Sequence, residues 1–262
     1  MAGLLGRLLG AGSPEADLDE TAWRDAITLP VFEGLDAEER RRLRDLAAAI
    51  LADKQFSGAG GADVDAYMRT AIATFAALPV LNLGAERYRG WREIIIYPGE
   101  FIHEGQETDA AGVVHHVRHV RSGEAMHGGP MVLSWDDVAA SGGGQGYNVV
   151  IHEFAHKLDM GNGAVDGLPP LHAGVNPTDW SAAFTSAYDD FRRRAERGSE
   201  GDIDPYAAQS PAEFFAVLSE YFFEWPEALH AAYPAVYEQM RRFYRQDPLK
   251  RLENPDRDPA NP

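Results

Sequence analysis

One short stretch of this chain limits both its fold and its chemistry more than any other. Residues 148–159 read NVVIHEFAHKLD, with His152 and His156 four positions apart. In a helix, residues at this spacing lie on one face, so the two imidazoles can share one metal ion. Glu153 follows the first histidine directly, in the position of the general base of a His-Glu-x-x-His motif. The stretch therefore predicts a helix that carries two metal ligands and a reactive carboxylate.

Apolar side chains occupy most other faces of this predicted helix. They are Val149, Val150, Ile151, Phe154, Ala155 and Leu158. Such a helix is buried nearly all round, and an unpaired buried polar group costs about a few kcal/mol. One metal ion satisfies both imidazoles, and zinc would then need a third protein ligand and one open position. We therefore expect one Zn²⁺ per chain, with a chance match among nine histidines as the alternative.

Composition narrows the kinds of site and partner. The chain has no cysteine, so a metal ion must be held by histidine and carboxylate. The absence of cysteine is also compatible with the cytoplasm, where we expect this protein to act. A net charge of −17 argues against direct binding of nucleic acid. No stretch has the apolar length of a membrane span, so we expect no membrane partner.

The order of the sequence patterns predicts an α+β fold. We expect an N-terminal helical layer and then a small mixed sheet that precedes the histidine helix. The expected elements are helices at 37–53, 63–77 and 180–196 (the last capped by Asp179), strands at 94–97, 113–120 and 130–135, and a polar loop at 104–111.

The expected domain organisation is simple. We expect a flexible N-terminus at 1–20, one domain at 21–250 and a disordered tail at 251–262. Within the domain, the helical part extends to about residue 90 and the catalytic part covers 91–250. Three further histidines, 115, 116 and 119, alternate between the two faces of a predicted strand. We therefore prefer a surface strand there to a second metal site.

Spacing alone does not identify the third metal ligand. Ser210 followed by proline predicts a helix start, and Glu213 three residues later fits a capping box, which is a structural role. A ligand on a second, apolar helix is chemically preferred, and residues 214–223 are rich in phenylalanine. The other candidates are Glu220, Glu224 and Asp159.

Several separated segments resemble the Mlc titration factor A family of zinc-dependent peptidases. The likeness extends over about residues 20–250, which makes it more specific than the zinc motif alone. The segments are 152–159 (HEFAHKLD), 204–208 (DPYAA), 210–223 (SPAEFFAVLSEYFF) and 243–249 (FYRQDPL), with shorter ones at 78–81, 95–98 and 129–133.

The resemblance implies a zincin-like metallopeptidase, similar to the catalytic domain of anthrax lethal factor. It implies that His152, His156 and Glu213 hold zinc and that Glu153 activates water. Tyr206 matches a tyrosine that stabilises the oxyanion, which suits a phenol beside a metal. Glu220 then becomes a supporting or packing residue of the second helix, and Asp159 is expected to orient a histidine.

The resemblance also implies two activities for a protein of this kind. The first is aminopeptidase-type hydrolysis of short peptides, although the residues themselves do not separate exopeptidase from endopeptidase action. The second is binding of the glucose-responsive repressor Mlc, which relieves repression of sugar-uptake genes. The alternative function is a non-catalytic protein-binding regulator that sequesters a transcriptional repressor. The least favoured alternative is a non-catalytic domain with a coincidental motif.

Overall fold

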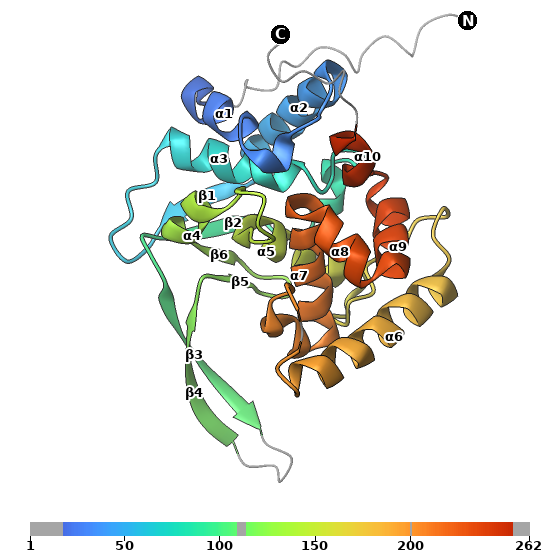
Figure 1. Ribbon diagram of the computed structural model, residues 1–262. Coiled ribbons are helices and arrows are strands. Elements are labelled where there is room, and N and C mark those ends of the chain that lie inside the picture. Colours follow the sequence, from blue (N-terminus) through green and yellow to red (C-terminus); the bar gives the residue numbers. More distant parts are fainter. Residues whose placement is uncertain (1–17, 109–113, 200, 254–262) are drawn as a thin grey trace, which may run out of the picture.

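The computed structural model describes residues 18–108, 114–199 and 201–253 (Figure 1). For residues 102–121, side chains are outside this description. The expected flexible N-terminus, 1–20, lies outside the described residues except for its last three. The expected tail lies outside them from residue 254 onward.

Three helices form the N-terminal helical layer, drawn in blue and cyan in Figure 1. They are α1 (Glu20–Ile27), α2 (Ala37–Asp53) and α3 (Ala66–Ala77). Asp36 accepts a hydrogen bond from the backbone of Glu39, whose side chain accepts one from the backbone of Asp36. This capping box explains why α2 begins where its sequence predicts. Helix α3 begins three residues later than expected, because Asp65 caps it through the backbone N–H of Met68.

A four-stranded mixed sheet lies beneath these helices in the view of Figure 1. Its order is β1-β2-β6-β5, with β5 antiparallel to β6 and the other two pairs parallel. The strands are β1 (Gln55–Gly58), β2 (Glu93–Tyr97), β5 (Gly123–Ala125) and β6 (Met131–Ser134). The predicted mixed sheet before the histidine helix is therefore present. The part expected to be helical up to about residue 90 also contains one strand that the sequence did not predict, because β1 pairs with β2.

A separate hairpin extends from the body of the protein (Figure 1). Strands β3 (Phe101–Thr108) and β4 (Val114–Arg121) pair antiparallel and do not join the main sheet. The loop predicted at 104–111 was wrong for residues 104–108, since pairing with β4 satisfies the backbone of these polar residues. The histidines at 115, 116 and 119 lie on β4, but their side chains are outside the described part. The surface-strand interpretation therefore stays a prediction.

The remaining elements carry the site or cover it. They are α4 (Trp135–Ala140), α5 (Val149–Asp159), α6 (Pro177–Ala195), α7 (Pro211–Glu224), α8 (Pro226–Ala232), α9 (Pro234–Tyr244) and α10 (Pro248–Leu252), with 3₁₀ helices η1 (Pro30–Phe32), η2 (Ala85–Tyr88), η3 (Met160–Asn162) and η4 (Pro205–Ala208). Helix α6 begins earlier than predicted. Asn176, not Asp179, is its cap and accepts hydrogen bonds from the backbone of Thr178 and Asp179.

Helix α10 attaches the end of the described chain to the N-terminal layer. The Gln246 side chain donates to the carbonyl of Leu78 at 2.8 Å. The side chain of Arg251 packs against Gly34, where a Cβ would lie 2.6 Å from the Arg251 carbonyl oxygen. Arg251 and Leu252, which were expected to belong to a disordered tail, are instead the last residues of α10.

Helix α5 lies at the centre of the hydrophobic core. Phe154 is fully buried, and its ring centroid lies 4.7 Å from that of Tyr88 and 5.6 Å from that of Trp91. Helix α5 also contacts α3, β5, β6 and α7. It is therefore buried nearly all round, as its sequence predicts. Over the described residues, none of the helices is both long and apolar enough to span a bilayer.

Candidate metal centre and its cleft

The start of α5 is held by side chains of α7. Asn148 caps α5 by accepting a hydrogen bond from the backbone N–H of Ile151 at 3.0 Å. Its own backbone N–H donates to Glu220 at 2.6 Å, and its side-chain amide donates to Glu224 at 2.8 Å. All three polar side chains are buried. The helix that carries the histidines is therefore anchored to the helix that carries Glu213.

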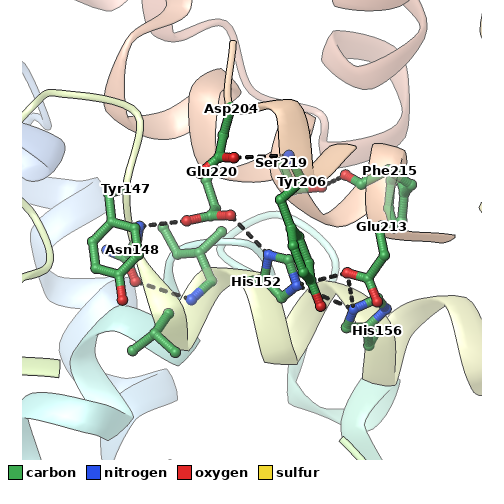
Figure 2. Close-up of polar contacts among 12 residues, drawn as sticks. Tyr147, Asn148, His152, His156, Asp204, Tyr206, Glu213, Phe215, Ser219 and Glu220 are labelled. Atoms are coloured by element: carbon green, nitrogen blue, oxygen red, sulfur yellow. Dashed lines mark hydrogen bonds and ion pairs between the residues drawn. The ribbon is translucent and has the colours of Figure 1, made fainter. Parts of the chain in front are cut away.

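The start of α7 places Glu213. Ser210 caps the helix by accepting a hydrogen bond from the backbone N–H of Glu213 at 3.1 Å, and proline follows at the first helical position. This satisfies the backbone half of a capping box. The side chain of Glu213 extends toward the histidines (Figure 2). The cap fixes the backbone, which leaves the carboxylate available to the site.

Three ligand atoms meet between α5 and α7. The Nε2 atoms of His152 and His156 are 3.2 Å apart, and Oε2 of Glu213 lies 3.1 Å and 3.2 Å from them. A tetrahedral ion with bonds of about 2.0–2.1 Å separates its ligand atoms by about 3.3–3.4 Å, so the three atoms fit such an ion. Two imidazole nitrogens that face each other across this distance need a shared cation or proton between them. The described residues thus contain a His-His-Glu group able to hold a metal ion.

A carboxylate behind His152 sets the orientation of its ring. Glu220 Oε1 lies 2.7 Å from His152 Nδ1, so a proton on Nδ1 is donated to Glu220 and the lone pair on Nε2 faces the cluster. Burial raises the pKa of Glu220, and its contact with His152 opposes that rise. For Glu213, burial opposes ionisation, but hydrogen bonds with both histidines hold its pKa below the usual range.

Glu153 lies beside the cluster and next to β5. Its side chain is buried, and burial raises its pKa, while the nearby histidines oppose the shift. Among the described residues, Oε2 has no hydrogen-bond partner. A Cβ at Gly123 would lie 2.5 Å from Oε1 of Glu153, so only glycine leaves room for this carboxylate. A buried, unpaired carboxylate of raised pKa is suited to accept a proton near neutral pH.

Tyr206 lies on η4, the short helix that precedes α7. Asp204 caps η4 by accepting a hydrogen bond from the backbone N–H of Tyr206 at 2.8 Å. The Tyr206 side chain is 38% exposed, and its ring centroid lies 6.0 Å from that of His152. Figure 2 shows the tyrosine beside the two histidines and Glu213. The structure thus brings together all five side chains that the sequence analysis singled out.

A cleft of about 410 Å³ opens beside Glu153. Its volume is in the range of pockets that bind small molecules. The residues that line it belong to β5, the segment before α5, α5 itself, η4 and α7. The described residues that line it are Ser122, Gly123, Gln145, Gly146, Tyr147, Val149, His152, Glu153, Asp204, Tyr206, Val217, Glu220 and Tyr221.

The competing carboxylates have other contacts. Asp159 Oδ2 accepts a hydrogen bond from the backbone N–H of Gly167 at 2.9 Å. Among the described residues, neither Asp159 Oδ1 nor His156 Nδ1 has a hydrogen-bond partner, so the expectation that Asp159 orients a histidine stays a prediction. Burial raises the pKa of Asp159 to about 6. Glu220 is the carboxylate that orients an imidazole.

Sequence reasoning missed Asn148 and Gly123 as residues that shape the site, and it considered Glu224 only as a metal ligand, whereas Glu224 accepts a hydrogen bond from the Asn148 side chain. Asn148 directly before an apolar helical run is a recognisable cap, so this signal was present in the sequence. Gly123 gives no such signal, because its proximity to Glu153 arises only from the packing of β5 on α5.

A His-Glu-x-x-His helix, a carboxylate from a second helix and an adjoining cleft define a metallopeptidase. The chain belongs to the family described as glucose-regulated metallo-peptidase M90, whose model matches residues 13–245. It is 42% identical over 245 residues to Mlc titration factor A of Yersinia pestis (strain Pestoides F). The identity to the same-named protein of Yersinia pseudotuberculosis serotype O:1b (strain IP 31758) is also 42%, and each alignment covers 92% of this chain and 90% of the relative.

Proposed function

We propose that this chain is a zinc-dependent peptidase in which Glu153 activates water for hydrolysis of a peptide bond. The observation that carries the proposal is the 3.1–3.2 Å triangle of Nε2 and Oε2 atoms beside a buried carboxylate. Two imidazoles and one carboxylate are a typical ligand set of catalytic zinc. Zinc held there would act as a Lewis acid: it would polarise the carbonyl group of the substrate and lower the pKa of a bound water molecule.

Each residue of the site then has a separate role. His152, His156 and Glu213 hold the ion, and Glu220 keeps the His152 ring in the required tautomer. Glu153 accepts a proton from the attacking water and returns it to the leaving amine.

Tyr206 acts on the carbonyl oxygen of the scissile bond, whereas Glu153 acts on the attacking water. Its hydroxyl donates a hydrogen bond to the carbonyl oxygen as negative charge develops there. Its place on η4 beside His152 supports this role.

The zincin-like architecture is part of this proposal. The mixed sheet ends in the antiparallel strand β5, which lies against α5 next to Glu153. An extended peptide can lie along such a strand with its scissile bond toward the metal. We infer aminopeptidase-type activity from the family resemblance, and a cytoplasmic location remains a prediction of the sequence.

A set of variants tests the peptidase. We expect Glu153→Gln to keep bound zinc and lose hydrolysis of short peptides, because only the base is removed. We expect the double histidine variant, which carries His152→Ala and His156→Ala together, to lose both bound zinc and hydrolysis. Full activity in Glu153→Gln, or normal zinc content in the double histidine variant, would overturn the proposal.

A second candidate function is regulation through the repressor Mlc. The name of the Yersinia relatives, Mlc titration factor A, supports a protein that binds this repressor. The charge of −17 favours a basic partner such as a DNA-binding protein. A pull-down of Mlc with wild type, Glu153→Gln and the double histidine variant separates the two functions. Binding that survives in both variants identifies a non-catalytic regulator that sequesters the repressor.

A further inference from the structure

We propose that Lys157 is a positioning residue: it holds β5, the strand along which a substrate peptide would lie, in place beside Glu153. This inference rests on the proposed peptidase function. Lys157 is buried and is not among the residues that line the cleft, so it does not touch the substrate. It acts by fixing the turn that joins β5 to β6.

The ammonium group of Lys157 binds both ends of this turn. The residue is only 4% exposed. Its Nζ donates to the carbonyl oxygen of Met126 at 2.7 Å and to that of Gly129 at 2.9 Å. Within the turn, the backbone N–H of Met126 donates to the carbonyl of Pro130, and that of Gly129 donates to the carbonyl of Met126. A buried ammonium without hydrogen bonds is costly, so these carbonyls and the lysine hold each other in place.

The indole of Trp91 fixes the lysine in turn. Lys157 Nζ lies 4.6 Å from the centroid of the Trp91 ring, whose π face attracts a cation. Trp91 packs against Phe154, which is fully buried on α5. A second buried ammonium, that of Lys54, lies 4.0 Å from the same ring centroid. The turn is therefore attached, through Lys157, to a fixed point of the core.

The other end of β5 lies against the same helix. Glu153 and Lys157 are four residues apart, so they share one face of α5. Gly123 begins β5, and Oε1 of Glu153 lies 2.5 Å from the position of a Cβ on this glycine. The strand has three residues, which span about 10 Å. In so short a strand, a shift of the turn also moves Gly123 relative to the carboxylate.

Strand β5 is at the edge of the main sheet, as Figure 1 shows. Among the described strands it pairs only with β6, and Ser122 and Gly123 at its start line the cleft. An extended peptide that adds to a sheet edge gains backbone hydrogen bonds that depend on the position of that edge. The position of β5 thus determines how well a long substrate is held beside Glu153. A substrate too short to extend along the strand depends on it much less.

Substrate length tests the inference. Lys157→Met keeps most of the hydrocarbon stem and removes the ammonium group, so the turn loses both donated hydrogen bonds. We expect KM for a hexapeptide to rise about tenfold and KM for a dipeptide to change less than about twofold, at unchanged zinc content. A residue that only stabilises the fold would lower the melting temperature without making the loss depend on peptide length.

Lys54→Met is the matched control. Lys54 is also buried and its ammonium also contacts the Trp91 ring, but it donates to the carbonyls of Tyr88 and Trp91 instead of the turn. We expect this variant to lower the melting temperature as Lys157→Met does and to leave KM of both peptides unchanged. An equal rise in hexapeptide KM in the two lysine variants would overturn the positioning role. So would an equal loss for hexapeptide and dipeptide in Lys157→Met.

A second pair of variants tests the turn itself, including the case that Lys157→Met does not fold. Gly128 in the turn and Gly198 after α6 both have φ of 63°, and a Cβ at either meets no atom within 4 Å beyond its chain neighbours. Alanine is strained at a positive φ, so both substitutions have a similar cost in stability. We expect only Gly128→Ala to raise KM for the hexapeptide, by about threefold. A normal hexapeptide KM in Gly128→Ala would contradict the role of the turn.

Peptide binding in a Glu153→Gln background, measured by calorimetry, separates this inference from the peptidase proposal. In that background we expect Lys157→Met to weaken hexapeptide binding about tenfold. If the wild-type protein hydrolyses no peptide but binding shows this dependence, the peptidase proposal fails and the positioning of β5 stands. If hydrolysis is normal and Lys157→Met changes neither KM nor binding, only the positioning role is overturned.

Discussion

Glu220 Oε1 lies 2.7 Å from His152 Nδ1, while its other oxygen accepts the backbone N–H of Asn148 at 2.6 Å. One side chain of α7 therefore fixes both the tautomer of a metal-binding imidazole and the start of the helix that carries it. The position of the metal centre depends on this contact as well as on the three ligands.

Replacing Glu220 tests this contact. Glutamine offers one acceptor where the native side chain uses two, so the Glu220→Gln variant must give up one of them. We expect zinc binding to weaken by about 10- to 100-fold, measured by competition with a chelator of known affinity. Glu227→Gln is the control, since Glu227 is exposed on α8. Equal zinc affinity in the two variants would show that Glu220 only packs.

The two roles of the Glu213 position can be separated by mutation. In Glu213→Gln the backbone N–H still donates to Ser210, so we expect normal thermal stability of the metal-free protein but loss of tight zinc binding. In Ser210→Ala we expect the reverse, a loss of about 1 kcal/mol of stability with zinc stoichiometry retained. Thermal unfolding and metal analysis of both variants check this. The reverse pattern of losses would show that Glu213 is mainly a capping residue.

The close approach of Gly123 to Glu153 predicts a loss of turnover without a loss of metal. In Gly123→Ala the new methyl group would displace the carboxylate, whose Oε1 lies 2.5 Å from the Cβ position. We expect kcat to fall on the order of 100-fold at unchanged zinc content. Gly143→Ala is the control, because a Cβ there has no other atom within 4 Å. A Gly123→Ala enzyme with normal kcat would remove Glu153 from the role of base.

Glu224 predicts a pH dependence of stability. Burial raises its pKa from 4.5 to about 7. The folded protein thus binds this proton more tightly than the unfolded chain does. Its contribution to stability is complete below about pH 4.5 and is lost as pH rises through 7.

The Glu224→Gln variant measures that contribution. We expect the stability of the parent relative to this variant to fall by on the order of 2 kcal/mol between pH 4.5 and 7.5. Urea unfolding of both proteins with metal chelated provides the comparison. Parallel pH profiles would show that Glu224 does not titrate in this range.

Metal binding should stabilise the fold, because the ion would join α5 to α7. At free zinc about 100 times the dissociation constant, the expected gain is about 2.7 kcal/mol. We expect the melting temperature to rise with added zinc and to fall after chelation. The His156→Ala variant should respond much less. If added zinc did not change the melting temperature of the wild-type protein, the proposal of a zinc site between α5 and α7 would be contradicted.

Much of this fold could be predicted from the sequence, but only where the signal is local. Helix α2 has a capping box and α7 a serine-proline start, and both begin where the sequence indicates. Strands β1 and β5 read QFSG and GEA, which lack an apolar pattern and become strands only by pairing with β2 and β6. The polar residues of β3 were missed for the same reason.

Prediction of the metal site from the sequence was limited in the same way. The spacing of His152 and His156 is a local feature, so the sequence predicted their shared face. Four carboxylates competed for the third ligand, because the crossing of α5 and α7 that brings Glu213 to the histidines has no local signature. The same crossing gives Glu220 its place behind His152, which periodicity alone could not assign.

The attachment of α10 has a practical meaning for anyone who shortens this protein. The family match ends at residue 245, yet Gln246 and Arg251 lie beyond that point and contact Leu78 and Gly34. A recombinant protein that ends at residue 245 would lose these two contacts and would expose the part of the N-terminal helical layer that they cover. A truncation intended for crystallisation should therefore retain residues through Glu253.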